Sequence, residues 1–545
     1  MIPCDILLVI PARGGSKGIP RKNLRLLNGK PLIYYAIKTA LSSVYNLDIY
    51  VSSDDDEILN ISKQFGAKTH KRDSNISDDK STLDPVIFSC YSYAKEKEHK
   101  DYKYIITVQP TSPLLKVSTL DLAINKAIND QKIDTIIAAK EDTGLTWRFE
   151  KNKYLPNYKK RLNRQYLPSI FKETGAFVIT KNNIITDKTR IGKNVLLHRL
   201  DDGEDVDIDT FEDFNLCEYY LKRKHVLFVV TGNKKIGLGH VYNTLLLAND
   251  LINHKITFLV DNTSEMAYNK IKSNNYNVKI QRSPKLIDDI IKLNPDIIIN
   301  DILDTQKDYI KKLKKLEYKI INFEDLGEGS RYADVVINAI YPEKKVLKNH
   351  FLGHKYFVLR DEFLFSKRKK INKSVKRILI TFGGVDPNNY TLKVLKSIYD
   401  LCISKNIKID IITGYGYDNY QSLKDFKLAS IHKNISNISD FMYEADIIFT
   451  SAGRTVYEIA SIGTPAIVLA QNERELTHFF ASAEFGFINL GLGYEVENSK
   501  IINAFLELIS SKSNRFYMNE LMKKHNLKNG RKMVNQIIQN TINQG

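Results

Sequence analysis

The chain has 545 residues, of which 43% are hydrophobic and 26% charged, and its formal net charge is +18. This length exceeds what one hydrophobic core serves, so we expect two to four globular domains. Its four cysteines (Cys4, Cys90, Cys217 and Cys402) are scattered and form no C-x-x-C pair, which excludes a disulfide framework and a cysteine zinc site and favours a reducing cytoplasm. The start shows no signal pattern and no apolar run reaches membrane-spanning length, so we expect a cytoplasmic protein without a membrane partner.

The lysines that make the chain basic are spread over its whole length, and neither a basic helix nor an RNA-binding motif stands out. A generally basic surface attracts small anionic substrates as readily as it attracts nucleic acid. We therefore expect anionic small-molecule substrates and no nucleic-acid partner.

A basic, glycine-rich loop follows the first apolar run and precedes a helical pattern. The apolar run is typical of a buried parallel strand, and the glycines after it allow the backbone to approach a ligand closely. Backbone N–H groups and cations gathered in this way predict a polyphosphate site, although a solvated basic loop is the alternative. The loop has neither the Gly-Lys-Ser/Thr ending of a P-loop nor the G-x-G-x-x-G pattern. The candidate ligand-binding residues of the loop are Arg13, Gly14, Gly15, Lys17, Lys22 and Asn23.

Strands alternate with helices through the first 140 residues, which predicts a parallel sheet with helices on both faces. In such sheets ligands bind at the carboxyl ends of the strands. The glycine-rich loop, residues 52–54 and residues 109–113 all follow expected strands. We therefore expect these three segments to converge on one crevice.

An acidic segment, Asp-Val-Asp-Ile-Asp-Thr, occupies residues 205–210. Because side chains two residues apart in a strand point to the same face, we expect a strand that presents Asp207 and Asp209 together. Paired carboxylates suit Mg²⁺, which takes oxygen ligands and also binds substrate phosphates. A strand end neutralised by neighbouring lysines is the alternative. The sequence thus predicts a Mg²⁺ site on Asp207 and Asp209.

The stretch Ile-Pro-Ala-Arg-Gly-Gly-Ser-Lys-Gly-Ile-Pro-Arg-Lys-Asn at residues 10–23 closely resembles the opening signature of the CMP-sialic acid synthetase family. These cytidylyltransferases join CTP to a nonulosonic acid such as sialic, legionaminic or pseudaminic acid. The resemblance implies CTP as substrate, a Rossmann-like nucleotidyltransferase domain, and a homodimer formed through the sugar-binding lobe. It also implies that Arg13, Lys22, Asp207 and Asp209 are catalytic, the last two within the family's metal motif.

The resemblance implies further contacts to both substrates. Thr174 and Val178 stand where the family usually has asparagine and tyrosine, so the identity of the sugar stays open. The residues implied to bind the nucleotide, besides the opening loop, are Arg72, Ser81 and Thr82. Those implied to bind the sugar are Gln109, Thr111, Ser112, Arg164 and Gln165.

We expect the first domain to cover residues 1–223, because a new apolar strand begins at 226–230 after a charged run. Two further α/β units are expected at 225–366 and 374–545, separated by a lysine-rich connection. Each opens with a strand followed by a glycine loop. The predicted fold class is therefore α/β throughout, with a GT-B-like pair of Rossmann-like subdomains that enclose a nucleotide cleft in the second half.

His240, at the start of an expected helix, is the candidate catalytic residue of the second half. The helix dipole there favours the neutral imidazole, which suits a general base, whereas a capping or core histidine is the alternative. The loop at residues 451–453 precedes a helix and is expected to bind a diphosphate, with Glu458 on the ribose. The candidate nucleotide-sugar residues of this half are Gly237, Gly239, His240, Gly383, Gly384, Ser451, Ala452, Gly453 and Glu458.

Residues 226–486 resemble the UDP-sugar hydrolase of pseudaminic acid biosynthesis, whose proposed water-activating histidine falls on His240. The resemblance implies a bifunctional enzyme that hydrolyses a UDP-diacetamido-trideoxyhexose and activates a nonulosonic acid with CTP. Where that family has an Asp-His-Tyr-like segment, this chain has Asn-Asp-Ile-Leu at residues 300–303. Two alternatives therefore stay open for the second half. It could be a GT-B glycosyltransferase, or a catalytically inactive nucleotide-binding or docking module that uses Arg331 and basic loops.

Overall fold

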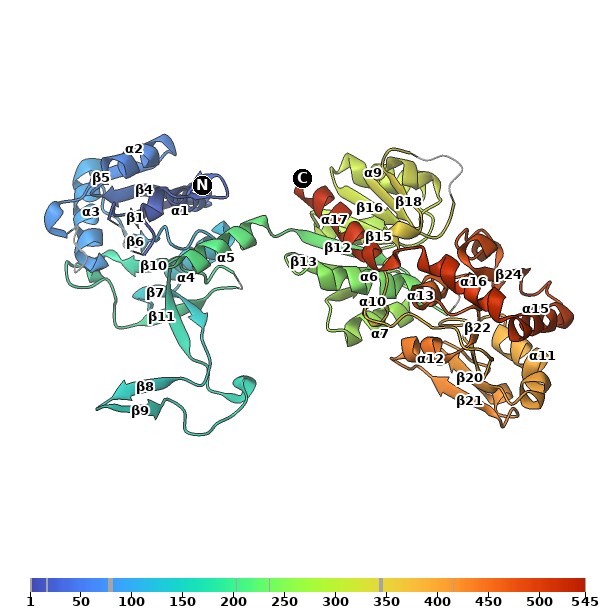
Figure 1. Cartoon of the computed structure of the whole chain (residues 1–545). Coiled ribbons are helices and arrows are strands. Elements are labelled where there is room, and N and C mark those ends of the chain that lie inside the picture. The colour runs from blue at the N-terminus through green and yellow to red at the C-terminus, as the bar shows by residue number, and fades with distance from the viewer. Residues whose placement is uncertain are drawn as a thin grey trace. The chain divides into compact units, whose positions relative to one another are not determined.

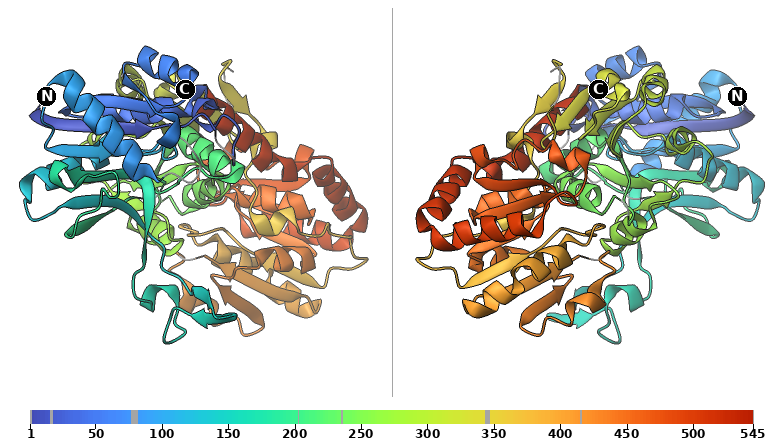
Figure 2. Two further views of the ribbon diagram at one scale, coloured as in Figure 1. Left: turned by 90° about the vertical axis from the view of Figure 1, so that its left-hand side faces the viewer. Right: turned by 90° about the vertical axis from the view of Figure 1, so that its right-hand side faces the viewer.

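The computed structural model describes residues 2–15, 18–76, 82–201, 203–234, 236–342, 347–414 and 416–544. The chain divides into two compact units, Met1–Arg223 and Lys224–Gly545. Each unit has its own sheets and hydrophobic cores, and helices cover the sheets on both faces (Figure 1, Figure 2). In the described part of the chain, no helix is both long and apolar enough to cross a membrane.

The first unit is built on a seven-stranded sheet. One strand, β10, runs antiparallel to both of its neighbours, and all other neighbouring pairs are parallel. The strands are, in spatial order, β11 (Val195–Arg199), β7 (Thr135–Glu141), β10 (Phe171–Lys181), β6 (Tyr104–Thr107), β1 (Ile2–Pro11), β4 (Tyr45–Ser53) and β5 (Lys68–Lys71).

The central strand β1 is apolar on both faces, as the sequence predicts. Leu8 and Ile10 belong to the core on one side of the sheet, whereas Leu7 and Val9 belong to the core on the other side. Helices cover both cores, and the side-chain caps of two of them are visible at their starts, on Asp55 before α2 and on Thr210 before α5. These helices are α1 (Leu32–Leu41), α2 (Asp56–Gln64), α3 (Leu83–Glu98), α4 (Val117–Asn129) and α5 (Phe211–Lys222).

Two short antiparallel pairs complete the first unit. β2 (Leu26–Leu27) pairs with β3 (Lys30–Pro31), and β8 (Trp147–Glu150) pairs with β9 (Lys153–Pro156). The second pair projects from the sheet of its own unit (Figure 1).

The second unit contains two sheets in which all strands are parallel. The first sheet has the order β14 (Val278–Ile280), β13 (Lys255–Val260), β12 (His225–Val230), β15 (Ile297–Asp301), β16 (Lys319–Phe323), β17 (Val335–Asn338) and β18 (His350–Leu352). The second sheet has the order β21 (Ala429–Lys433), β20 (Lys408–Thr413), β19 (Arg377–Ile380), β22 (Ile447–Thr450), β23 (Ala466–Ala470) and β24 (Phe487–Leu492). Both sheets are Rossmann-like, which confirms the predicted α/β class.

Helices connect these strands, and three more follow the last strand, β24. Those of the first sheet are α6 (Gly239–Asp250), α7 (Glu265–Ser273), α8 (Leu286–Leu293), α9 (Lys307–Lys315) and α10 (Asp361–Leu364). Those that follow are α11 (Tyr390–Ser404), α12 (Ile438–Glu444), α13 (Thr455–Ile462), α14 (Glu473–Leu476), α15 (Asn498–Ser510), α16 (Lys512–Lys523) and α17 (Gly530–Asn543).

The last helix, α17, returns to the first sheet of the second unit. Val534, Ile538 and Ile542 pack in the core formed around β12 and β13, and Arg531 pairs with Asp250 at the end of α6 at 2.6 Å. Helix α17 therefore packs on the first of the two sheets, although the sequence assigned all of residues 374–545 to the second subdomain. Apolar periodicity predicts the helix but does not say which sheet it covers.

Candidate active sites

The loop after β1, the end of β4 and the loop after β6 lie at one edge of the first sheet, where these three strands are neighbours. The N–H of Gly14 donates to Oδ1 of Asp54 at 3.0 Å. The N–H of Gln109 donates to the carbonyl of Gly175 in β10 at 3.1 Å. A Cβ on Gly14 would lie 2.8 Å from Oδ2 of Asp55, so a larger residue here would displace the side chain that caps α2. The predicted convergence of the three segments is confirmed.

The predicted strand at residues 205–210 is wrong. The segment is a turn followed by irregular chain between β11 and α5. The N–H of Ile208 donates to the carbonyl of Thr111 at 2.8 Å. This is a single hydrogen bond to a loop and not the repeated pairing of a β-ladder. Ile208 is buried in a small core with Ile19 and Leu32, whereas the side chain of Asp209 is 78% exposed.

The acidic segment contacts the opening loop. Nζ of Lys22 donates to the carbonyl of Ile208 at 2.7 Å and lies 3.4 Å from Oδ1 of Asp209. A Cβ on Gly18 would lie 2.7 Å from the carbonyl oxygen of Asp209. The loop and the segment are therefore parts of one site, and the glycine at position 18 permits their close approach.

Three polar atoms beside this contact are buried and have no hydrogen-bond partner among the described residues. They are Oδ1 of Asp207, Oγ1 of Thr111 and Oγ of Ser112. A Cβ on Gly175 would lie 3.1 Å from Oγ1 of Thr111 and 3.2 Å from Oδ1 of Asp207, so these two atoms lie beside the backbone of β10. An unpaired buried polar group costs about 1–3 kcal/mol. Such a cluster is typical of a site that a polar ligand completes.

Two other predicted residues support the loop and the sheet. The side chain of Asn23 is buried, and its Nδ2 donates to the carbonyl of Arg13 at 2.9 Å, so it holds the loop backbone. Arg72 is also buried, and its Nη2 donates to the carbonyl of Ser52 at 2.9 Å. Burial lowers the pKa of the Arg72 guanidinium from its usual value.

The remaining predicted residues of the first unit are more exposed. Gly15 and Thr82 are exposed, and Arg164 and Gln165 lie exposed on the 3₁₀ turn η3 (Arg164–Tyr166). In the described part of the chain, no hydrogen bond connects this turn with the strand-end crevice. Lys17 and Ser81 lie outside the described residues.

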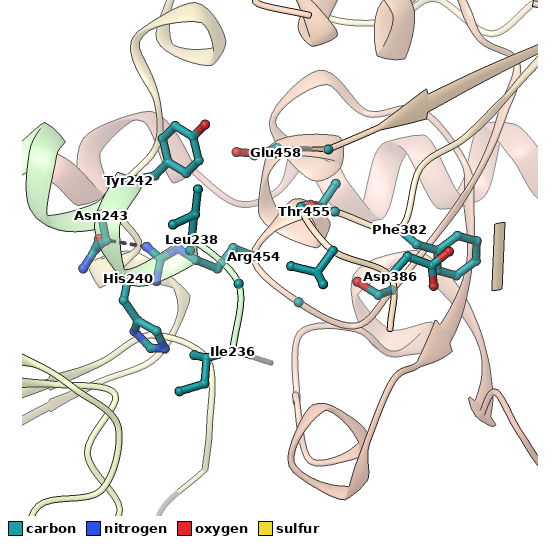
Figure 3. Close-up of a pocket in the computed structure, with 18 of the residues that line it drawn as sticks. Ile236, Leu238, His240, Tyr242, Asn243, Phe382, Asp386, Arg454, Thr455 and Glu458 are labelled. Carbon is teal, nitrogen blue, oxygen red and sulfur yellow. Dashed lines mark hydrogen bonds between the residues drawn. The ribbon is translucent and has the colours of Figure 1, made fainter. Parts of the chain in front are cut away.

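The second unit contains a cavity of about 990 Å³ between its two sheets (Figure 3). Residues from both subdomains line it, including eight of the nine that the sequence singled out. Ala452, the middle residue of the loop 451–453, is fully buried in the core and does not line the cavity. The eight are Gly237, Gly239, His240, Gly383, Gly384, Ser451, Gly453 and Glu458.

His240 forms a pair with Asp301 at the end of β15. Nδ1 of His240 lies 2.5 Å from Oδ1 of Asp301, whose side chain is fully buried. Nδ2 of Asn243 donates to the other carboxylate oxygen at 2.8 Å. A carboxylate at Nδ1 sets the tautomer of the imidazole, leaves Nε2 as the basic nitrogen and stabilises the imidazolium after protonation. This arrangement is that of a general base with its orienting acid.

The role of Asp301 was not predicted, because residues 300–303 stand out in the sequence only as a departure from the hydrolase pattern. An acidic residue at the carboxyl end of a parallel strand, where ligands bind, was a usable signal. Glu458, predicted for the ribose, is buried at the cavity wall and accepts a hydrogen bond from Nε of Arg360 at 2.6 Å. The Glu458 carboxylate can accept further hydrogen bonds, for example from a ribose hydroxyl.

The loop at residues 451–453 is supported from behind by a buried histidine. Nδ1 of His478 donates to the carbonyl of Ala452 at 2.7 Å, and Nε2 has no partner among the described residues. Burial lowers the pKa of His478 to about 4, and the charge of Arg454 acts in the same direction.

We expect His478 to make the second unit sensitive to acid. A histidine whose pKa is lower in the folded than in the unfolded state costs stability as the pH falls from about 6.5 towards 4. This cost approaches about 3 kcal/mol at the acid end. Urea unfolding of the wild type and of His478→Gln, followed by circular dichroism at pH 7, 5.5 and 4, checks it. Between pH 7 and pH 4, the wild type should lose about 3 kcal/mol more of its unfolding free energy than the variant loses. If the unfolding free energies of the two proteins fall in parallel with pH, the expectation is contradicted.

The comparisons with known proteins agree with the geometry of the first unit. The sequence model of the family described as cytidylyltransferase matches residues 7–226. A pseudaminic acid cytidylyltransferase of Campylobacter jejuni is 31% identical over 226 residues, which cover 40% of this chain and 97% of that protein. The chain belongs to the cytidylyltransferase family.

The family's domain accounts for the first unit, and a second relative extends over both units. A Helicobacter pylori protein named pseudaminic acid cytidylyltransferase and UDP-2,4-diacetamido-2,4,6-trideoxy-beta-L-altropyranose hydrolase is 24% identical over 489 residues. The alignment covers 85% of this chain and 87% of that protein. Because each unit is shorter than 85% of the chain, the alignment extends over both units. An uncharacterised protein of Methanocaldococcus jannaschii is 34% identical over 274 residues, which cover 46% of this chain and 56% of that protein. The chain thus spans little more than half the length of this relative.

Proposed function

We propose that the chain is a bifunctional enzyme of nonulosonic acid biosynthesis. The first unit transfers CMP from CTP to the anomeric hydroxyl of a nonulosonic acid and releases pyrophosphate. The second unit hydrolyses a UDP-diacetamido-trideoxyhexose to the free sugar and UDP. The contact of the Lys22 loop with the acidic segment carries the first activity. The His240–Asp301 pair in the cavity carries the second.

In the first unit, the anomeric hydroxyl oxygen attacks the α-phosphorus of CTP and loses its proton to solvent. The bond between the α-phosphorus and the oxygen that bridges it to the β-phosphorus breaks, and its electron pair leaves with pyrophosphate. Such a transfer depends mainly on positioning and on neutralisation of the charge that develops on the leaving group. Lys22 and Arg13 supply positive charge on the loop that faces the phosphates. The unpaired hydroxyls of Thr111 and Ser112, together with Gln109, bind the sugar.

Asp207 and Asp209 fit the predicted Mg²⁺. Oδ1 of Asp207 is buried without a partner among the described residues, and the carboxylate of Asp209 is open to solvent. The described residues contain no group of three or more His, Cys, Asp or Glu side chains suited to a metal. Substrate oxygens and water would therefore complete the ligand set, as is common for Mg²⁺. When bound, Mg²⁺ supplies positive charge beside the reacting phosphate.

In the second unit, a water oxygen attacks the anomeric carbon of the UDP-sugar. Nε2 of His240 takes a proton from this water, and Asp301 stabilises the resulting imidazolium. The bond between the anomeric carbon and the β-phosphate oxygen breaks, and its electron pair leaves with UDP. The diphosphate binds at the loop 451–453 before α13, where backbone N–H groups and the helix dipole favour an anion. Glu458 binds the ribose.

We further propose a cytoplasmic homodimer that forms through the lobe around β8 and β9. Trp147, Phe149, Tyr154 and Tyr166 are all more than half exposed in this lobe, and clustered exposed aromatic side chains are typical of protein interfaces. Sedimentation of the full chain should give the mass of two copies, and a monomer at micromolar concentration would contradict this assembly.

Two assays on the full chain test the proposed function. With CTP and Mg²⁺, pyrophosphate should be released only when a nonulosonic acid is added, and a panel of sialic, legionaminic and pseudaminic acids identifies the sugar. With a UDP-diacetamido-trideoxyhexose and no acceptor, UDP should be released in the same preparation. UDP release that depends on an added acceptor would indicate a glycosyltransferase instead. Binding of UDP without any turnover would indicate an inactive module.

A further inference from the structure

Arg454 projects into the cavity of the second unit directly after the loop 451–453, and it is not among the candidate residues predicted from the sequence. Its Nη2 donates to Oδ1 of Asn243 at 2.8 Å, a contact drawn as a dashed line in Figure 3. Asn243 in turn donates to Asp301 at 2.8 Å. A Cβ on Gly239 would lie 3.3 Å from Cδ of Arg454. One arginine of the second subdomain thus contacts the start of α6, which carries the base His240, and is connected through Asn243 to the acid Asp301.

The positive charge of Arg454 is incompletely neutralised. Its salt-bridge partner in the described part of the chain is Glu324, whose Oε1 lies 3.8 Å from Nη1. Burial raises the pKa of Glu324 to about 7, so this carboxyl is only partly ionised at neutral pH. Arg360, which also lines the cavity, has instead two close carboxylate partners, Glu458 at 2.6 Å and Glu362 at 3.0 Å.

The surroundings of Arg454 favour an anion beside it. Its guanidinium carbon lies 4.7 Å from the centre of the Phe357 ring, and its side chain is 21% exposed, so water screens the charge only in part. The preceding residues, 451–453, form the loop before α13 that is expected to hold the diphosphate, and Arg454 is the N-cap residue of that helix. An arginine donates several hydrogen bonds in a planar fork that matches phosphate oxygens. The bond to Asn243 leaves further N–H groups free for such a ligand.

We propose that Arg454 is a catalytic residue of the second unit, which binds the diphosphate of the UDP-sugar and neutralises the charge on the departing UDP. This inference rests on the proposed hydrolase function and deepens it. As the bond from water oxygen to the anomeric carbon forms, the electron pair of the breaking bond stays on the β-phosphate oxygen beside Arg454. The water proton passes to His240. Because Asn243 connects Arg454 with Asp301, the base and the leaving-group cation are held as one hydrogen-bonded unit.

Binding of UDP itself, measured by calorimetry on the full chain, tests this assignment without requiring turnover. Arg454→Met should weaken UDP binding about 10- to 100-fold, the range of charge-assisted hydrogen bonds. Arg454→Lys should recover part of the affinity, because it restores the charge but not the planar fork. Arg282→Met, an exposed arginine in the loop after β14, serves as the matched control and should bind UDP as the wild type does.

A second variant separates binding from positioning. Asn243→Ala should keep the UDP affinity of the wild type but lower kcat for UDP release, since it removes the hydrogen bonds of Asn243 to both Arg454 and Asp301. If Arg454→Met binds UDP as tightly as the wild type, the assignment of Arg454 is overturned. If UDP binding weakens in Arg454→Met while the wild type releases no UDP from the sugar nucleotide, the diphosphate contact stands and the hydrolase function fails.

Discussion

Replacing His240 with glutamine is expected to lower the rate of UDP release by about 10²- to 10⁴-fold, the range that a positioned general base contributes. Glutamine keeps much of the volume of the imidazole but has no basic nitrogen at neutral pH. The affinity for UDP should change little, because the base acts on water and not on the diphosphate. Initial rates of UDP release without an acceptor, combined with calorimetric binding of UDP, give both quantities.

Asp301→Asn should reproduce much of this loss, although Asp301 does not contact the substrate. The side-chain NH₂ of the asparagine can take the place of Oδ1 and donate to Nδ1 of His240. This favours the tautomer that carries its proton on Nε2, which cannot act as the base, and a neutral amide does not stabilise an imidazolium. Since the two residues act as one unit, the double variant should be scarcely slower than His240→Gln alone.

A second histidine of the same unit provides the control for both variants. His225 lies at the opposite end of β12 from the cavity and contacts Thr257, so His225→Gln should release UDP at the wild-type rate. Unchanged UDP release in His240→Gln would refute hydrolysis by this base. A loss in His225→Gln as large as in His240→Gln would show that substitution disturbs the fold rather than the chemistry.

Replacing Asp207 with asparagine is expected to lower the rate of pyrophosphate release by the first unit about 10²- to 10³-fold. Removal of one group that stabilises a charged transition state has an effect of this size. The same substitution should leave the unfolding temperature unchanged or raise it. Oδ1 of Asp207 is buried with no partner among the described residues, so its charge is a cost to the protein without ligand. Pyrophosphate assays across a Mg²⁺ titration, together with thermal unfolding, measure both effects.

Asp205→Asn is the matched control for Asp207→Asn. Oδ1 of Asp205 accepts a hydrogen bond from the N–H of Gly203 at 3.2 Å, and an asparagine carbonyl can accept the same bond. This variant should keep both activity and Mg²⁺ dependence. A marked fall in the unfolding temperature of Asp207→Asn, or full activity in it, would contradict the assignment of Asp207 to the metal.

Several elements of the fold could be predicted closely from local sequence. The apolar strand expected at residues 226–230 is β12, and the helix expected after residues 451–453 is α13. Their signals are short apolar runs or helical periodicity bounded by polar residues, which depend on neighbouring residues in the chain. Strand β10 was not predicted, because the insertion of an antiparallel strand between β6 and β7 follows from long-range pairing.

The candidate sites divide in the same way. The glycine-rich loop, the acidic segment and His240 could be chosen from the sequence, because residue types and their order carry that information. The predicted strand for the acidic segment failed, because the one backbone bond described for Ile208 goes to a loop at Thr111. Ile208 is nevertheless buried and Asp209 exposed, because Ile208 packs in a core with Ile19 and Leu32.

The sequence by itself determined the parallel α/β architecture, the two glycine-loop sites and their chemical class, since these depend on local patterns of residues. Only the tertiary structure decided which side chains cooperate. Asp301, Asn243 and Arg454 come from β15, α6 and the start of α13, and they form one hydrogen-bonded chain with His240. Partners so far apart in the chain are brought together by strand order and by the packing of two subdomains, and local sequence carries no signal for either.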